Sequence, residues 1–256
     1  MRTILDSTWL TFVFPLFLFV FLALGVIYSR RFYHRHKRVW KPVGIENGLL
    51  GIFAILISFT MVVSGNFDRE RADYIHGEAE ELSLIFRTSK LYDDTLRRRV
   101  HQYLKDFLRV QLSKKTPSTR ECAQLIDSIE AIDRTLDLFL LDYRQRNATA
   151  EADIKNLIPL LTKASSKYYL LLYSFMERTP VPMMVTLILL SFTMAFLVGF
   201  MNSFQETPNN VIPVIFFITT VLMITGIRDL DNPSRGLITP RYEELEDIQK
   251  LIKNSR

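Results

Sequence analysis

The sequence predicts an all-α, polytopic membrane protein with four transmembrane helices and a helical extramembrane domain inserted between helices 2 and 3. Two observations carry this prediction. Four stretches without Asp, Glu, Lys or Arg are each long enough to cross a bilayer, which takes about 20 apolar residues in a helix; they are residues 9–28, 47–67, 179–205 and 207–227. The polar middle, residues 68–178, has helical periodicity and no useful run of period-two alternation.

The first helix pair is expected within residues 1–67, with spans at about 9–28 and 47–67 joined by a basic connector at 29–46. Basic residues follow the first apolar run instead of preceding it, which indicates a retained span and not a cleaved signal peptide. Short basic loops stay in the cytoplasm. The connector is therefore predicted to be cytoplasmic because it carries only basic charges before Glu46: Arg30, Arg31, Arg35, Lys37, Arg38 and Lys41.

The net charge of +5 is a topology signal, since it lies almost entirely in that connector. Residues 68–178 hold 19 basic and 18 acidic side chains, and residues 228–256 hold six of each. This balance predicts no nucleic-acid partner. With four spans, the insert and the C-terminus lie opposite the connector, but arginines beside the membrane on that side leave the side of the insert open.

Within the insert, residues 68–178, apolar stripes predict helices at about 72–90, 95–112, 122–143 and 150–176. The third stripe alternates by three and four over three heptads: Cys122, Leu125, Ile129, Ile132, Leu136, Phe139 and Tyr143. It fits either a dimerising coiled coil or ordinary packing within the helical domain. Cys122 is the only cysteine, which excludes an intrachain disulfide and CxxC-type sites.

Small residues recur at helical spacing on two of the spans. Helices in lipid pack closely through such residues, so we expect packing faces here. They are Gly51, Ala54 and Ser58 on the second span, and Ser191, Ala195 and Gly199 on the third. The alternative is that part of such a face lines a pore.

A second row on the second span, Phe53, Ile57 and Met61, is apolar with i,i+4 spacing. Apolar rings of this kind gate channels by dewetting when subunits surround an axis, so these residues are candidate pore-lining or gate residues. The alternative is that they face lipid. No ionisable residue lies inside a span, which disfavours an ion pump or a proton-coupled transporter.

The second helix pair is expected within residues 179–228, with spans at about 182–204 and 208–227. An acidic exit turn and a C-terminal helix or tail follow at 229–256. The turn comprises Asp229, Asp231, Asn232, Pro233 and Gly236. It is expected to be a membrane-exit cap with local ion pairs, and divalent-cation binding is the alternative.

Motifs of nucleotide, hydrolase and zinc chemistry are missing from the sequence: it contains no GxxxxGK[ST], GxGxxG, GxSxG or HExxH. We therefore expect no enzyme activity, no catalytic residue, no metal and no cofactor.

Three segments resemble the bestrophin-like family of bacterial and plant membrane proteins. The second span runs into a charged helix of the type F-D-x-R-R…E-E-A-N, matched by Phe67, Asp68, Arg69, Arg71, Glu78 and Ala79, with Glu80 in place of the Asn. Residues 96–103, LRRRVHQY, look like the family's basic-aromatic helix. Residues 229–236 are similar to its D-x-D-x-P-x-x-G signature, with Ser234 where an aromatic is usual.

The resemblance implies a homo-oligomer, a pentamer by analogy with bestrophin anion channels, with a passive pore for small ions. The bulky aromatic motifs of a bestrophin's second span are absent here. The competing hypothesis is a non-conducting scaffold or sensor whose helical domain binds a partner. Either way, the chain is expected to lie in a lipid bilayer, the bacterial inner (plasma) membrane.

Overall fold

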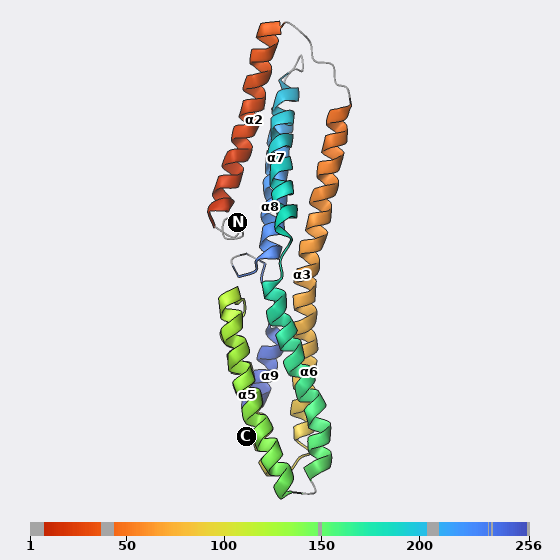
Figure 1. Ribbon diagram of the computed structural model, residues 1–256, viewed down its shortest axis with the longest axis vertical. Helices are drawn as coiled ribbons and strands as arrows, with labels where there is room; N and C mark the ends of the chain where they lie inside the picture. Colours follow the sequence, from red (N-terminus) through yellow and green to blue (C-terminus); the bar gives the residue numbers. More distant parts are fainter. Residues whose placement is uncertain are drawn as a thin grey trace. The chain divides into compact units, whose positions relative to one another are not determined.

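The computed structural model describes residues 8–36, 44–147, 150–203, 210–234, 236 and 238–254. Across those residues every regular element is an α-helix, as the sequence predicts. The helices, labelled in Figure 1, are α2 (Thr8–His36), α3 (Ile45–Ser89), α4 (Asp94–Ser113), α5 (Thr119–Arg146), α6 (Glu151–Met176), α7 (Val181–Asn202), α8 (Val211–Asp231) and α9 (Glu243–Asn254).

The chain divides into two compact units. The membrane unit comprises Met1–Asn66 and Thr179–Asn232, and the helical unit comprises Phe67–Arg178 and Pro233–Arg256. Four stretches are long and apolar enough to cross a membrane, namely Phe12–Arg31, Ile45–Ser89, Glu151–Asn202 and Val211–Asp231. The predicted all-α fold with four such helices is confirmed.

Helix α3 belongs to both units, because the second span continues without a break into the first charged helix. Its 45 residues give a length of about 68 Å at the helical rise. A bilayer's hydrocarbon core is only about 30 Å thick. Part of α3 must therefore lie outside the membrane, and the first charged residue after Glu46 is Asp68.

In the membrane unit, α2, α7 and α8 pack against one another. Helix α7 begins at Val181 after the N-cap Pro180, and a second proline occupies its first turn. Proline is tolerated there because first-turn amides have no partner within the helix. The predicted turn between the last two spans falls in residues 204–209 and lies outside the described residues.

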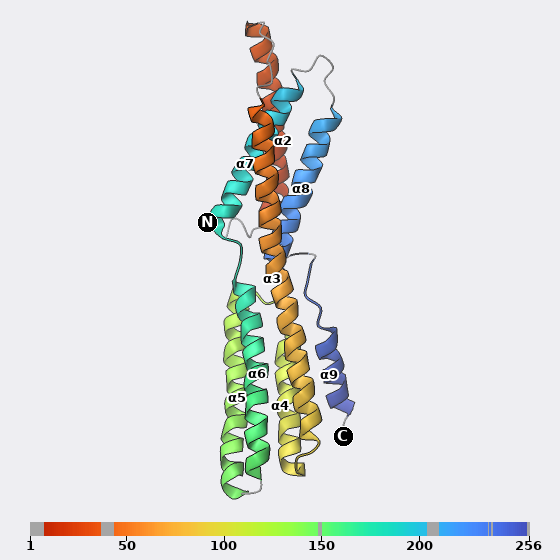
Figure 2. The same cartoon turned by 90° about the vertical axis from the view of Figure 1, so that its right-hand side faces the viewer.

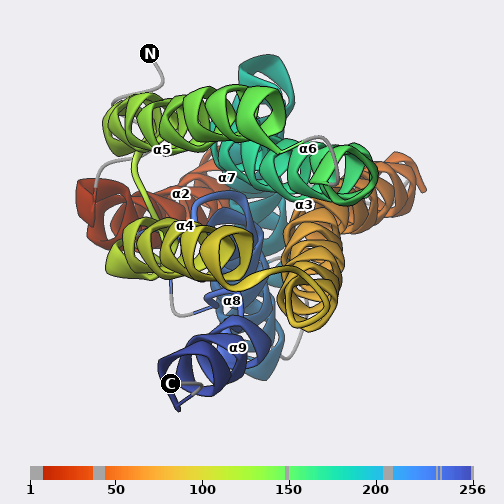
Figure 3. The same cartoon turned by 90° about the horizontal axis from the view of Figure 1, so that it is seen from below.

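In the helical unit, α5 and α6 form an antiparallel hairpin (Figure 2). Helix α4 packs against α5 on one side and α9 on the other, as Figure 3 shows from below. The predicted stripes supply the shared core, which includes Ile75, Leu82, Val100, Phe107, Ile129, Leu157 and Tyr168.

Helix α5 begins at Thr119, a few residues before the stripe that predicts it, with Ser118 as the N-cap residue. The backbone amide and hydroxyl of Ser118 both donate to the Glu121 carboxylate at 2.9 Å. The hydrogen bonds from Lys114 and then Ser118 lower the pKa of Glu121 to about 2. This capping box fixes the start of the hairpin.

The C-terminal tail, expected as a separate segment, belongs to the helical unit. Its apolar residues Tyr242, Leu245, Ile248 and Ile252 are buried in the unit's core. The Tyr242 hydroxyl also donates to the Lys115 carbonyl at 2.6 Å. The spacing of three and four among the last three of these residues predicts the helix, but burial against α4 could not be read from it.

Candidate functional site

The small residues of α7 lie at a close helix crossing with α2. Ser191, Ala195 and Gly199 are all buried. A Cβ atom on Gly199 would collide with the backbone carbonyl of Leu22, and one on Gly25 with that of Phe196. Backbones in contact leave no room for side chains, which is how small residues join helices in lipid. Sequence reasoning missed Gly25, whose only signal was a single glycine in the first span.

The apolar row on α3 faces its own bundle in the protomer. Phe53 is buried, with its ring centroid 6.1 Å from that of Phe216 on α8. Ile57 and Met61 are half-buried and pack against the same core. These contacts hold α3 against α8. The gate role of the row therefore stays a prediction.

The small residues of α3 lie on the opposite, open face. Gly51, Ala54 and Ser58 are exposed in the protomer, and a Cβ on Gly51 would have open space around it. We call this surface the α3 open face; it comprises Gly48, Gly51, Ile52, Ala54, Ile55, Ser58, Phe59 and Val62. It mixes small, polar and large apolar groups. The exposed residues of α2 and α8 are instead mostly large and apolar, such as Phe12, Leu16, Val20, Leu24, Ile215, Ile218 and Leu222.

The acidic exit turn includes a buried connection within the membrane unit. Asp231, at the end of α8, is buried and accepts a hydrogen bond of 2.5 Å from the Thr179 backbone amide. The Thr179 hydroxyl lies 3.0 Å from the Ser64 hydroxyl of α3. One carboxylate thus joins the end of α8 to the segment before α7, and Thr179 extends the link to α3.

The other members of the exit turn differ in exposure. Asp229 is half-buried, Asn232 is the buried C-cap residue of α8, and Pro233 is buried directly after it. Gly236 is half-buried. In the described part of the chain, no three His, Cys, Asp or Glu residues are grouped to hold a metal ion.

The charged part of α3 carries a fully buried arginine, Arg71. Its Nε and Nη2 atoms donate to the Ser174 carbonyl of α6 at 3.4 and 3.2 Å, and its guanidinium lies 5.5 Å from the centre of the Phe175 ring. A guanidinium tolerates such a site because it spreads its charge and stacks on aromatic rings.

Two turns further along α3, Glu78 lies in the same core. Gln111 of α4 donates from Nε2 to Glu78 Oε2 at 2.6 Å. Burial raises the pKa of Glu78 well above its usual range, although the Gln111 hydrogen bond opposes this. Burial, and after it the neighbouring Glu78 carboxyl, also raises the pKa of both Tyr168 and Tyr242. A polar cluster from four segments therefore lies inside an otherwise apolar core.

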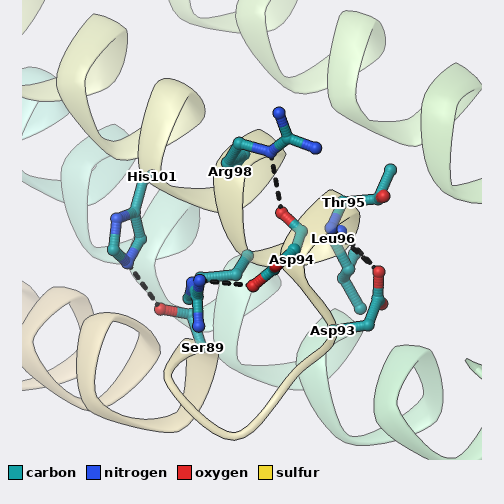
Figure 4. Close-up of polar contacts among 8 residues, drawn as sticks. Ser89, Asp93, Asp94, Thr95, Leu96, Arg98 and His101 are labelled. Atoms are coloured by element: carbon teal, nitrogen blue, oxygen red, sulfur yellow. Dashed lines mark hydrogen bonds and ion pairs between the residues drawn. The ribbon is translucent and has the colours of Figure 1, made fainter. Parts of the chain in front are cut away.

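The far end of α3 meets α4 through a capped turn. Asp93 accepts hydrogen bonds from the amides of Thr95 and Leu96 at 2.9 and 3.4 Å (Figure 4). It also accepts one of 2.6 Å from the Tyr143 hydroxyl of α5. Burial would raise the pKa of Asp93, but these hydrogen bonds lower it overall. The cap therefore ties the α3–α4 turn to the end of α5.

A histidine lies beside this turn. His101 Nε2 is 3.0 Å from the Ser89 hydroxyl (Figure 4), and its ring centroid lies 5.1 Å from that of Phe86, with the two rings tilted by 36°. Arg98 Nε donates to the Asp94 carbonyl at 3.1 Å in the same figure. Burial, followed by positive charges nearby, lowers the pKa of His101; those charges belong to Lys105, Arg97 and Lys90. The site favours neutral imidazole.

Family comparison agrees with this architecture. Residues 11–239 match the family described as Bestrophin-like domain, which is most of the chain. The chain belongs to the bestrophin-like family. The resemblance read from the sequence is therefore confirmed. No curated protein and no solved structure matches the chain.

Some of the residues on which the family resemblance rests are buried or hydrogen-bonded in this bestrophin-like chain. Arg71 and Glu78 are two of the buried polar residues of α3, while Asp68 is half-buried and Arg69 is exposed. Asp231 of the acidic signature makes the link to Thr179. Family membership and four apolar helices together indicate a multi-pass membrane protein.

Proposed function

We propose that this bestrophin-like chain assembles into a homo-oligomer whose central pore lets small ions cross the membrane passively. Family membership supports the proposal, since bestrophins proper are pentameric anion channels. The uncharged spans support it too: a pump or proton-coupled transporter needs ionisable groups within the membrane, and none lies in these stretches. Anions are the substrate class that the family favours.

The observation that carries the proposal is the α3 open face. Lipid-facing surfaces are uniformly apolar, as the outward residues of α2 and α8 mostly are. Gly51, Ala54 and Ser58 break that pattern on α3. Small residues suit a contact with a neighbouring helix, and a hydroxyl suits water in a pore. We therefore place the neighbouring protomer or the pore against this face.

Phe53, Ile57 and Met61 stay candidate gate residues, with a role in positioning α3, because they pack against the bundle of their own chain. Their packing toward α8 favours the open face as the border of the pore. In this arrangement the row would set the pore width indirectly, by fixing how closely α3 lies against its own bundle.

Flux from liposomes tests the proposal. Purified chain is reconstituted in vesicles loaded with chloride, and efflux is followed under several salts. We expect efflux above that of empty vesicles, with an anion preference. Efflux equal to that of empty vesicles under every salt would contradict conduction.

A second candidate function, a scaffold or sensor, is favoured by a groove in the helical unit. About 370 Å³ of space lies between α4 and α5, bordered by polar residues Arg99, Gln102, Asp106 and Arg109 and by apolar Ile132 and Leu136. A groove of this size holds a small ligand or part of a partner helix. A monomer or dimer by mass measurement in detergent would favour this function, because neither encloses a symmetric pore.

A further inference from the structure

Glu78 and Gln111 share one hydrogen bond, and the second oxygen of Glu78 and the amide oxygen of Gln111 take no part in it. Both side chains are inside the helical unit, 0% and 1% exposed. Gln111 Nε2 donates to Glu78 Oε2 at 2.6 Å. Glu78 Oε1 and Gln111 Oε1 are buried and have no hydrogen-bond partner within the described residues. Two buried acceptors without a donor would cost stability, about 1–3 kcal/mol for each such group.

The surroundings of Glu78 supply no ion pair within the described part of the chain. Gln111 is neutral, and so at pH 7 are the two tyrosines that Glu78 influences, Tyr168 of α6 and Tyr242 of the C-terminal segment. The nearest buried cation on its own helix is Arg71, which bonds to the Ser174 carbonyl. An ionised Glu78 would thus be an unpaired buried charge.

A single proton on Glu78 removes both the unpaired buried charge and the lack of a donor for the two acceptor oxygens. We propose that Glu78 is a proton-binding site, held as a neutral carboxylic acid whose Oε1–H donates to Gln111 Oε1. The acid and the amide then form a cyclic pair with a hydrogen bond in each direction, which joins α3 to α4. The proton comes from solvent when the domain packs and returns to solvent on ionisation. This inference is independent of the proposed pore.

The pair makes the packing of α3 against α4 sensitive to pH. Because burial raises the pKa of Glu78, the native state holds a proton that the unfolded state has lost above about pH 4.3. Stability contributed by this group is complete below that pH and declines as pH rises toward the folded pKa. The unfolding equilibrium constant rises up to about tenfold per pH unit in that window.

Infrared difference spectroscopy tests protonation directly. The spectrum of the full chain minus that of Glu78→Gln, at pH 7 in detergent, should contain a carboxylic-acid carbonyl band. Glu80→Gln is the matched control, because Glu80 is exposed on the same turn; its difference spectrum should contain carboxylate bands only. A carboxylate signature for Glu78 would contradict the proposal, and one that changes with added Na⁺, K⁺ or Ca²⁺ would assign the site to a metal ion instead.

Hydrogen exchange tests the pair itself. Glu78→Gln keeps a hydrogen bond in each direction without titrating at position 78, so amides of α3 and α4 should stay protected from pH 7 to 9, above the range in which His101 titrates. In the wild type and in Glu80→Gln, protection should fall with rising pH, after correction for intrinsic rates. Glu78→Met removes both hydrogen bonds and should lower protection at every pH. Equal pH dependence of protection in wild type and Glu78→Gln would overturn the proposal. If Glu78→Gln does not fold, the wild type is titrated to high pH instead: loss of its carboxylic-acid carbonyl band supports the proposal, and absence of such a band at every pH overturns it.

Discussion

Single residues decide how closely the helices of the membrane unit approach. Gly199 and Gly25 sit where the backbones of α2 and α7 touch, whereas Gly51 faces open space on α3. All three are glycines in apolar helices, so composition does not distinguish them. Their surroundings show that Gly25 and Gly199 pack inside the chain, whereas Gly51 makes no close contact within it.

Replacing Gly199 by Ala should destabilise the chain, because the new methyl group meets backbone that cannot rotate away. Overpacking typically costs about 1–3 kcal/mol, which thermal unfolding in detergent would detect as a lower midpoint. Gly65→Ala is the matched control on α3, because an added Cβ there meets nothing within 4 Å, and it should leave the midpoint unchanged. If both variants unfold at the same temperature, the assignment of the α2–α7 contact is wrong.

The pH dependence of His101 runs opposite to that of Glu78. Because burial and nearby cations lower the pKa of His101, the unfolded state binds a proton that the native state refuses. This contribution to stability is present above about pH 6.5 and declines as pH falls toward the folded pKa. Hydrogen exchange in the α3–α4 turn should therefore accelerate below that pH in the wild type and not in His101→Gln. The same acid response in both would assign it to another group.

At the scale of elements, helix ends are fixed by carboxylates. Asp93 caps α4, Glu121 completes the cap of α5, and Asp231 holds the segment before α7. Each accepts hydrogen bonds from backbone amides that lack helical partners. The same chemistry thus serves the helical unit and the membrane unit.

Asp93→Ala should destabilise the helical unit by about 0.5–2 kcal/mol, the usual cost of losing an N-cap. It removes the hydrogen bonds to two amides and to the Tyr143 hydroxyl. Asp94→Ala, which loses only an exposed ion pair with Arg97, should have a smaller effect of about 0–1 kcal/mol. Urea unfolding followed by circular dichroism ranks the two; a reversed order would contradict the cap assignment.

Asp231→Ala should destabilise the membrane unit by about 1–3 kcal/mol, because it leaves the buried Thr179 amide without this acceptor. Asp231→Asn keeps an acceptor oxygen and should lose less. Thermal unfolding in detergent compares them. An Ala variant as stable as wild type would show that the exit turn is not a structural link.

For the molecule as a whole, the sequence was informative where pattern alone determines structure. Helical class, the four apolar helices and the stripes of the helical unit follow from residue spacing. The continuity of α3 from Ile45 to Ser89 was visible only as a span running into a charged helix. The choice of which helices pack together could not be predicted, because periodicity shows which face of a helix is buried and not which helix covers it. The Glu78–Gln111 pair, 33 residues apart along the chain, and the packing of α9 on α4 depend on that choice.

The membrane topology, meaning the side of the bilayer on which each segment lies, is also a property of the whole molecule. If each of the four apolar helices crosses the bilayer once, the loop near Thr116 and the C-terminus lie on one side of it, opposite the basic connector. Reporter fusions at these two positions should therefore give the same side, and a fusion in the connector the cytoplasmic one. Opposite results for Thr116 and the C-terminus would mean that the number of spans is wrong.

The most direct test of the central claim places a thiol on the α3 open face. In a Cys122→Ser background, Ser58→Cys is reconstituted in liposomes and treated with a charged methanethiosulfonate reagent during chloride efflux. Thr219→Cys, exposed on α8, is the matched control. A pore bordered by α3 predicts efflux that falls at least several-fold for Ser58→Cys and stays unchanged for Thr219→Cys. Efflux unaffected at Ser58, or equally affected at both positions, would contradict it.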